Sequence, residues 1–144
     1  MSIGYEVQIP PIYTLAFYNA IANNGKYIEP LFVKSINKNG LVVREFKARV
    51  INSQICKPST LKDVRQALLG VVENPKYGTG KVVHSPYIRI AGKTGTAQIS
   101  KGSAGYSAGG KSHQVSFCGF FPYENPRYTC IVVIREPKIG YPSG

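Results

Sequence analysis

Two segments of the chain carry hydrophobic residues at the spacing of an α-helix. The first opens at Pro10-Pro11, has apolar residues as far as Ala22, and closes at Asn24-Gly25. The second covers residues 59–74, and its apolar stripe consists of Leu61, Val64, Leu68, Val71 and Val72. Proline at the start, glycine after the end and such a stripe are typical of core-packed helices. We expect a helix over each segment, with the Ser59 hydroxyl capping the second.

Five other segments have the composition of β-strands. Residues 27–37 and 41–46 flank Asn39-Gly40, a strong signal for a two-residue hairpin turn. Three more strands, rich in β-branched and aromatic residues, are predicted at residues 87–100, 113–121 and 128–136. Their close succession favours an antiparallel meander, in which residues 100–111 form a glycine- and serine-rich loop.

These elements together predict an α+β fold in which helices cover an antiparallel sheet. Residues 130–134 show no polar alternation, so we expect both faces of that strand to be covered, with the helices as the natural cover. The prediction places residues 1–144 in one partial domain. Residues 27–56 form a peripheral hairpin and linker within it.

The composition limits the possible partners. The chain has 144 residues, is 43% hydrophobic and has a formal net charge of +11, which suits nucleic acid, anionic lipid or another anionic polymer. Its basic residues are scattered among strands and turns, and its aromatic residues fall in apolar strands, where packing explains them better than base stacking. We therefore expect no nucleic-acid partner. No apolar run approaches the roughly eighteen residues of a membrane span.

The cysteines and histidines do not have the spacing of a metal site. Cys56, Cys118 and Cys130 form no ligand pattern, and His84 and His113 are not placed to complete one. A turn at residues 123–126 would bring Cys118 and Cys130 face to face, or nearly so, across a hairpin. A disulfide is possible there, but we expect buried free thiols, because antiparallel neighbours often lack bridging geometry.

The segment Ala91–Gln98 carries the clearest chemistry in the chain. It places the cation of Lys93 beside the hydroxyls of Thr94 and Thr96 on a predicted strand. Gly95 has no Cβ, so the backbone of a ligand could lie close to the strand there. A cation, two hydroxyls and an open backbone are suited to binding a carboxylate.

A phosphate-binding loop is the obvious rival for this segment, because Gly92-Lys93-Thr94 matches the end of the Walker A pattern. That pattern requires a glycine five residues before Gly92. The chain has Tyr87 there, and the residues between favour a strand, so we reject nucleotide binding.

The segment from Ala91 to Gln98 resembles the third active-site motif of penicillin-binding proteins and serine β-lactamases, whose other motifs are Ser-x-x-Lys and Ser-x-Asn. Within that group the chain is most similar to class B penicillin-binding proteins, the division-type peptidoglycan D,D-transpeptidases. The other segments that carry this resemblance are residues 3–8 with Pro11, residues 17–26, Gly78-Thr79-Gly80, residues 116–122 and residues 126–128.

The first two family motifs are not identified in the chain. Ser35-Ile36-Asn37-Lys38 and Ser59-Thr60-Leu61-Lys62 satisfy the first pattern literally, and Ser35-Ile36-Asn37 also fits the second. We reject them, because Ser35 runs into the Asn39-Gly40 turn and Ser59 has a simpler use as a helix cap. The resemblance therefore implies the C-terminal part of a transpeptidase domain, with the nucleophilic serine upstream.

The resemblance also implies roles for individual residues. Lys93 and Thr96 would be catalytic, and Thr94, Gly95 and Thr96 would bind substrate, with no metal and no cofactor. The substrates would be peptidoglycan stem peptides ending in D-Ala-D-Ala, and β-lactams would bind the same site. Other implied partners are the N-terminal part of the same domain and other cell-wall or division proteins. The complete protein would work outside the cytoplasmic membrane, held by an N-terminal anchor.

Two alternatives stay open at this point. A β-lactam sensor or a β-lactamase would carry the same third motif. A non-catalytic basic module that binds an anionic polymer would explain the net charge, and its binding would depend steeply on salt but not on Lys93.

Overall fold

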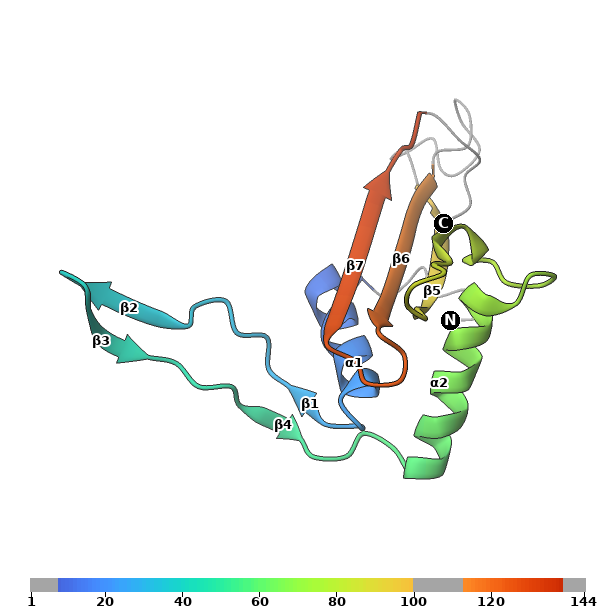
Figure 1. Cartoon of the computed structure of the whole chain (residues 1–144). Coiled ribbons are helices and arrows are strands. Elements are labelled where there is room, and N and C mark those ends of the chain that lie inside the picture. The colour runs from blue at the N-terminus through green and yellow to red at the C-terminus, as the bar shows by residue number, and fades with distance from the viewer. Residues whose placement is uncertain (1–7, 100–112, 139–144) are drawn as a thin grey trace.

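The computed structural model describes residues 8–99 and 113–138. The loop expected at residues 100–111 lies outside this part, as do residues 3–7 of the family-like segment. The described part contains α1 (Pro11–Ala22), β1 (Tyr27–Ile28), β2 (Ser35–Lys38), β3 (Leu41–Glu45), β4 (Val50–Asn52), α2 (Pro58–Glu73), the 3-10 helix η1 (Lys81–Val83), β5 (Ala91–Gln98), β6 (His113–Phe121) and β7 (Tyr128–Arg135). Figure 1 shows α1, α2 and the sheet β5–β6–β7 gathered into one body, from which β1–β4 extend as a long ribbon.

The three C-terminal strands form an antiparallel sheet in the order β5–β6–β7. Ala91 lies opposite Phe120 and Thr96 lies opposite Val115, while Cys118 of β6 lies opposite Ile131 of β7. The predicted meander and the α+β class are therefore confirmed.

The hydrophobic core joins the sheet to both helices. Ala91 and Phe120 are opposite each other, so they share one face of the sheet, and both are fully buried. They pack with Ile21 at the end of α1 and with Leu61 in the first turn of α2. Figure 1 shows the two helices beside the sheet, as the sequence predicts.

Helix α1 has the predicted boundaries. Pro11 is its first residue, where a missing N–H costs nothing. At the other end Asn24 adopts a left-handed conformation with φ 52°, and the N–H of Gly25 donates to the carbonyl of Ala20 at 2.8 Å. This is the long hydrogen bond of a Schellman motif, which satisfies a carbonyl at the helix end.

The predicted cap of α2 is wrong. The helix begins at Pro58, its N-cap residue is Lys57, and no side chain forms a capping hydrogen bond. Ser59 therefore already lies inside the helix. The reason is that Pro58 has a fixed φ and no N–H, so it occupies the first helical position and moves the cap to the residue before it.

Strand β5 begins four residues later than predicted. Residues 87–90 have β-forming side chains, but Tyr87 is 92% exposed and the segment pairs with no strand in the described part. Instead, the carbonyl of Arg89 accepts a hydrogen bond from the N–H of Tyr123, and the guanidinium of Arg89 pairs with Glu124. Residues 87–90 therefore bind the turn between β6 and β7 through Arg89, and this tertiary contact overrides the local β-propensity.

Strand β7 is less covered than the sequence suggests. It is an edge strand of the described sheet, and Val132 and Ile134 are 49% and 50% exposed. From the sequence we expect both faces of this strand to be covered. Among the described residues α1 packs on β7, but no element covers the other face of β7, so this expectation is not met.

The cysteines do not form a disulfide. Cys118 and Cys130 are free, as expected, and Cys56 is free as well; Cys118 is buried as expected, whereas Cys130 is exposed. Cys130 lies opposite Gly119, so the two cysteines are nearly opposite each other across the hairpin, as expected, but the offset of one position points their thiols to opposite faces of the sheet. Burial raises the pKa of Cys118 to about 12, which keeps its thiol protonated and unreactive at neutral pH.

The ribbon consists of two short antiparallel pairs, β2 with β3 and β1 with β4. Asn39 and Gly40 have positive φ values of 50° and 79°, which fit the tight turn between β2 and β3. The strand predicted over residues 27–37 is interrupted at residues 29–34, because Pro30 has no N–H to donate to a neighbouring strand. That residues 27–56 form a peripheral unit of the domain stays a prediction.

Candidate active site

Strand β5 passes from the core to the surface along its length. Ala91 and Gly92 are buried, whereas Lys93 and Thr96 are exposed. The register places Thr94 opposite Phe117 and Thr96 opposite Val115, so both hydroxyls lie on one face of the sheet. Lys93 leaves the strand on the opposite face.

The side chain of Lys93 reaches around the strand to its neighbour. Its Nζ donates to the carbonyl oxygen of Thr94 at 2.8 Å and to the Oγ1 of Thr94 at 3.2 Å. A cation therefore lies directly beside a threonine hydroxyl, at the edge of the sheet. This arrangement concentrates positive potential where an anion could approach.

The backbone of β5 is open along this edge. Within the described residues β5 pairs with β6 alone, and the Thr94 carbonyl points away from β6, because Lys93 Nζ reaches it. In an antiparallel strand both polar groups of a residue point to the same side, and the side alternates with each residue. The N–H of Thr96 therefore lies on the same open edge as the Thr94 carbonyl, with the Thr96 hydroxyl beside it.

The two glycines of the strand make room for different neighbours. A Cβ on Gly92 would lie 2.5 Å from Cζ of Phe117 and 2.7 Å from the carbonyl oxygen of Cys118, so a side chain cannot fit there. At Gly95 a Cβ would lie 2.6 Å from the Oγ of Ser116. Gly95 thus permits close approach of a side chain from β6, a use that the sequence did not reveal.

A threonine outside β5 completes the group of hydroxyls. The Oγ1 of Thr79 lies 2.9 Å from the Oγ1 of Thr94. The segment Gly78-Thr79-Gly80 was singled out by the sequence only for its family resemblance, and nothing in its spacing assigned Thr79 to the site. The two flanking glycines were the available signal, since paired glycines often mark a tight turn.

The rejected serines lie on other elements. Ser35 is the first residue of β2, on the ribbon, where it pairs with Glu45. Ser59 is an exposed residue of α2. Neither Ser35 nor Ser59 has a hydrogen bond to Lys38 or Lys62 among the interactions of the described residues.

Cavities and metal ligands do not point to another site. The described part includes cavities of about 470, 380 and 280 Å³, and none of the lining residues of these belongs to β5. The strand edge is instead an open surface. Among the described residues no group of three or more His, Cys, Asp or Glu side chains could hold a metal ion.

Comparison with known proteins identifies the family. The family model for the penicillin binding protein transpeptidase domain matches residues 1–144. The chain belongs to the penicillin-binding protein transpeptidase family. The resemblance to division-type enzymes that the sequence indicated is confirmed by relatives of this kind.

The curated relatives of this transpeptidase chain are considerably longer than the chain itself. The peptidoglycan D,D-transpeptidase FtsI homolog of Mesostigma viride is 32% identical, over 99% of this chain and 25% of that protein. The probable peptidoglycan D,D-transpeptidase PenA of Neisseria gonorrhoeae is also 32% identical, over 100% of this chain and 22% of that protein. The chain thus spans a quarter or less of their length.

Solved structures agree with the transpeptidase fold. Penicillin-binding protein 2X from Streptococcus thermophilus superimposes with a TM-score of 0.83 at 27% identity, over 97% of this chain and 22% of that one. Penicillin-binding protein 3 from Mycobacterium tuberculosis gives a TM-score of 0.78 at 28% identity, over 95% and 31%. None of the helices in the described part of the transpeptidase chain has the length and hydrophobicity needed to cross a membrane.

Proposed function

We propose that this chain is the C-terminal part of a division-type D,D-transpeptidase domain and contributes the Lys-Thr-Gly strand to its active site. The support is the family match over residues 1–144, together with the geometry of β5. The observation that carries the proposal is the position of Lys93 Nζ, 3.2 Å from the Thr94 hydroxyl on an open strand edge. We infer that the nucleophilic serine belongs to a part of the protein outside this chain.

The proposed reaction is acyl transfer in two steps. The serine Oγ attacks the carbonyl carbon of the penultimate D-alanine of a stem peptide. An ester forms while the peptide C–N bond breaks, and D-alanine leaves with the proton that the serine loses. An amine of a second stem peptide then attacks the ester, which forms the cross-linking amide and returns a proton to the serine. No cofactor or metal takes part in the proposed scheme.

Lys93 is the electrostatic centre of the proposed site. Its charge would attract the anionic end of the substrate and hold neighbouring groups in their working protonation states. The hydroxyls of Thr94 and Thr96 would bind the terminal carboxylate, with Gly95 between them on the substrate-binding strand. Each hydrogen bond to a charged group contributes about 1.5 to 3 kcal/mol.

The backbone of Thr96 has a second proposed role. Its N–H, on the open edge of β5, would donate to the oxyanion that forms when the serine attacks. In this family the other donor is the N–H of the serine itself, which this chain does not supply. Loss of one such donor lowers the rate by about a hundredfold or more, so we infer that the isolated chain is inactive.

Exposed apolar residues support a covering partner. Tyr13 and Phe17 of α1 and Val132 of β7 are about half exposed, although their neighbours form the core. We infer that the N-terminal part of the same domain covers them. The complete enzyme would work outside the cytoplasmic membrane, held by an N-terminal anchor, with other cell-wall or division proteins as partners.

A β-lactam acylation assay tests the proposal. The complete protein should form a covalent adduct with a fluorescent penicillin, whereas the isolated 144-residue chain should form none. Lys93→Ala should slow acylation of the complete protein by about a hundredfold, because it removes the charge beside the serine. Lys34→Ala, which removes an exposed lysine from the ribbon, should acylate at the wild-type rate. An adduct on the isolated chain, or an unchanged rate for Lys93→Ala, would contradict the proposal.

A further inference from the structure

We propose that Thr79 is a positioning residue of this active site: it fixes the direction of the Thr94 hydroxyl, so that this hydroxyl donates its hydrogen to an anionic group of the substrate. The inference rests on the proposed function and adds a residue to it. It starts from the 2.9 Å separation between Oγ1 of Thr79 and Oγ1 of Thr94.

The hydrogen-bonding capacity of the Thr94 hydroxyl decides which of the two threonines donates to the other. A hydroxyl can donate one hydrogen and accept two. The Nζ of Lys93 can only donate, so its 3.2 Å contact fills one acceptor position of Thr94 Oγ1. If Thr79 fills the other, the hydrogen of Thr94 has no partner within this cluster and is left for a ligand.

A bound carboxylate selects this arrangement. A carboxylate has no hydrogen to donate, so Thr94 can contact it only by giving its own. Thr79 must then be the donor between the two threonines. A hydrogen bond to a charged acceptor is about twice as strong as a neutral one, so the gain at Thr94 outweighs the preference of the threonine pair for either direction.

The turn that carries Thr79 is held by the end of helix α2. The N–H of Gly78 donates to the Asn74 carbonyl at 2.9 Å, and the N–H of Gly80 donates to the Val71 carbonyl at 2.9 Å. The side-chain oxygen of Asn74 also accepts two backbone N–H groups of the turn, from Lys76 and Tyr77, at 3.0 and 2.9 Å. Thr79 is therefore placed by backbone contacts on both sides.

The glycine directly before Thr79 is required by these contacts. A Cβ on Gly78 would lie 2.5 Å from the Asn74 carbonyl oxygen and 2.7 Å from that of Val71. Both neighbours are backbone atoms of the helix end, which cannot move aside easily. Helix α2 thus has two tasks: its first turn packs Leu61 into the core, and its last turn presents Thr79 to β5.

The test compares two acylating agents on the complete protein. Penicillin G carries a free carboxylate, and its methyl ester does not. Thr79→Val keeps the shape of the side chain and removes the donor, so its rate constant for acylation by penicillin G should fall by roughly threefold to tenfold. The same variant should react with the ester as fast as wild type does. Thr79→Ser keeps a hydroxyl and should restore the wild-type rate with both agents.

Controls separate this inference from a structural effect. Thr60→Val makes the same substitution on the exposed surface of α2 and should behave as wild type does. Thr79→Ala removes the hydroxyl without adding bulk. If Thr79→Val does not fold, Thr79→Ala should show the loss expected of that variant with penicillin G and none with the ester.

The outcomes distinguish the two proposals. If wild type is acylated but Thr79→Val matches Thr60→Val with penicillin G, the positioning role of Thr79 is overturned while the proposed function stands. The same holds if the loss is equal with the acid and the ester, since that marks a general structural defect. If wild-type protein is not acylated at all, the proposed function is overturned and the inference falls with it.

Discussion

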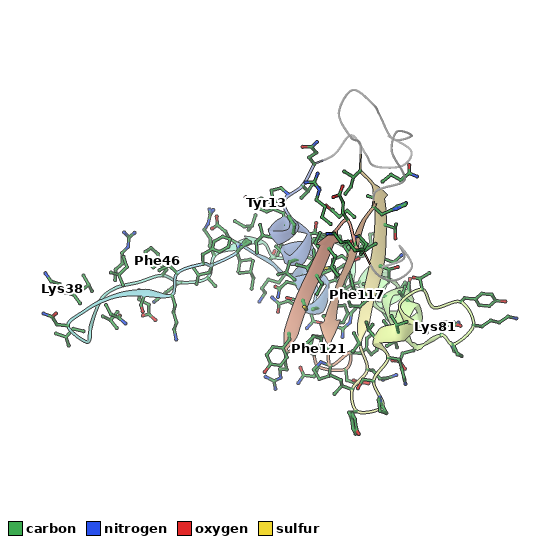
Figure 2. The ribbon with its side chains drawn as sticks, turned by 90° about the horizontal axis from the view of Figure 1, so that it is seen from above. Tyr13, Lys38, Phe46, Lys81, Phe117 and Phe121 are labelled. Carbon is green, nitrogen blue, oxygen red and sulfur yellow. The ribbon has the colours of Figure 1, made fainter. Side chains whose placement is uncertain are left out.

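The body and the ribbon use similar hydrophobic residues in opposite ways. In the body, Phe120 of β6 is completely buried between the sheet and the helices. In the ribbon, Phe32 is 80% exposed, and no side chain of strands β2 and β3 is buried. Figure 2 shows Lys38 and Phe46 far out along the ribbon, well away from Phe117 and Phe121 in the body.

The difference shows where the stability of the described chain comes from. The body has two helices on a three-stranded sheet, an arrangement that removes apolar surface from water. The ribbon is held by backbone hydrogen bonds and by one exposed ion pair, between Arg49 and Glu29, and an isolated two-stranded hairpin is only marginally stable in water. We therefore expect that substitutions of buried residues in the body lower the free energy of unfolding and that substitutions in the ribbon do not.

The largest contrast should come from the two phenylalanines. Phe120→Ala leaves a cavity between Ala91, Ile21 and Leu61 and should lower the unfolding free energy of the complete protein by about 3 to 5 kcal/mol. Phe32→Ala should change it by less than about 0.5 kcal/mol, as is usual at the surface. Chemical denaturation measures both values. A large loss for Phe32→Ala would mean that another part of the complete protein packs on the ribbon, and the contrast would fail.

Two arginines provide the next contrast. Arg65 donates to the Tyr123 carbonyl at 2.6 Å and stacks on the rings of Phe120 and Tyr123. Arg65→Met keeps the side-chain length but loses this bond, which should cost about 1.5 to 3 kcal/mol. Thermal or chemical unfolding of the variant gives the result.

Arg49 is the matched arginine of the ribbon. Its exposed hydrogen bond lowers the pKa of Glu29 below the ordinary value of a glutamate. The pair therefore favours the folded state when the pH is above that ordinary pKa, and this effect is lost as the pH falls through the lowered pKa. Arg49→Met should leave the unfolding midpoint unchanged near neutral pH, because exposed pairs contribute little. NMR titration should show the Glu29 pKa moving up towards its ordinary value. No such movement would mean that Arg49 is not its partner in solution.

A third contrast concerns two glycines of the body itself. Gly92→Ala pushes a methyl group into the ring of Phe117 and the backbone of β6, and should cost about 1 to 3 kcal/mol. Gly70→Ala, on an open surface of α2, should instead stabilise the protein by about 0.5 to 1 kcal/mol, since alanine favours helix. Unfolding curves of the two variants should therefore shift in opposite directions. Equal shifts would show that both the ring of Phe117 and the backbone of β6 move aside.

Local signals predicted much of the architecture. Prolines and glycines marked the boundaries of α1, and the apolar stripe of α2 includes the core residue Leu61. Strand β6 has the predicted bounds, and β7 ends one residue early. The errors occurred where a distant contact intervenes. Arg89 is drawn to Tyr123 and Glu124 instead of pairing as a strand.

The candidate site likewise contains residues that the sequence predicted and a residue that only a distant contact brings in. Residues 93–96 are proposed as site residues from the sequence alone because they are consecutive, and a strand presents consecutive residues in a fixed alternation. Thr79 was not assigned to the site, because its contact with Thr94 spans fifteen positions and depends on the turn after α2. The directions of the Cys118 and Cys130 thiols likewise depend on the exact register, in which Cys130 lies opposite Gly119.

The sequence by itself determined the family, the α+β class, the antiparallel meander and the strand on which the cation and hydroxyls lie. The family is indicated by the resemblance of a consecutive motif and its accompanying segments, and the fold elements follow from hydrophobic period and turn residues, all of which act over short distances along the chain. Only the tertiary structure decided that Lys93 reaches round to Thr94, that Ser116 fills the space beside Gly95 and that Thr79 meets Thr94. Such contacts depend on how separate elements are placed against one another, and this placement is set by packing and backbone hydrogen bonds rather than by local preference.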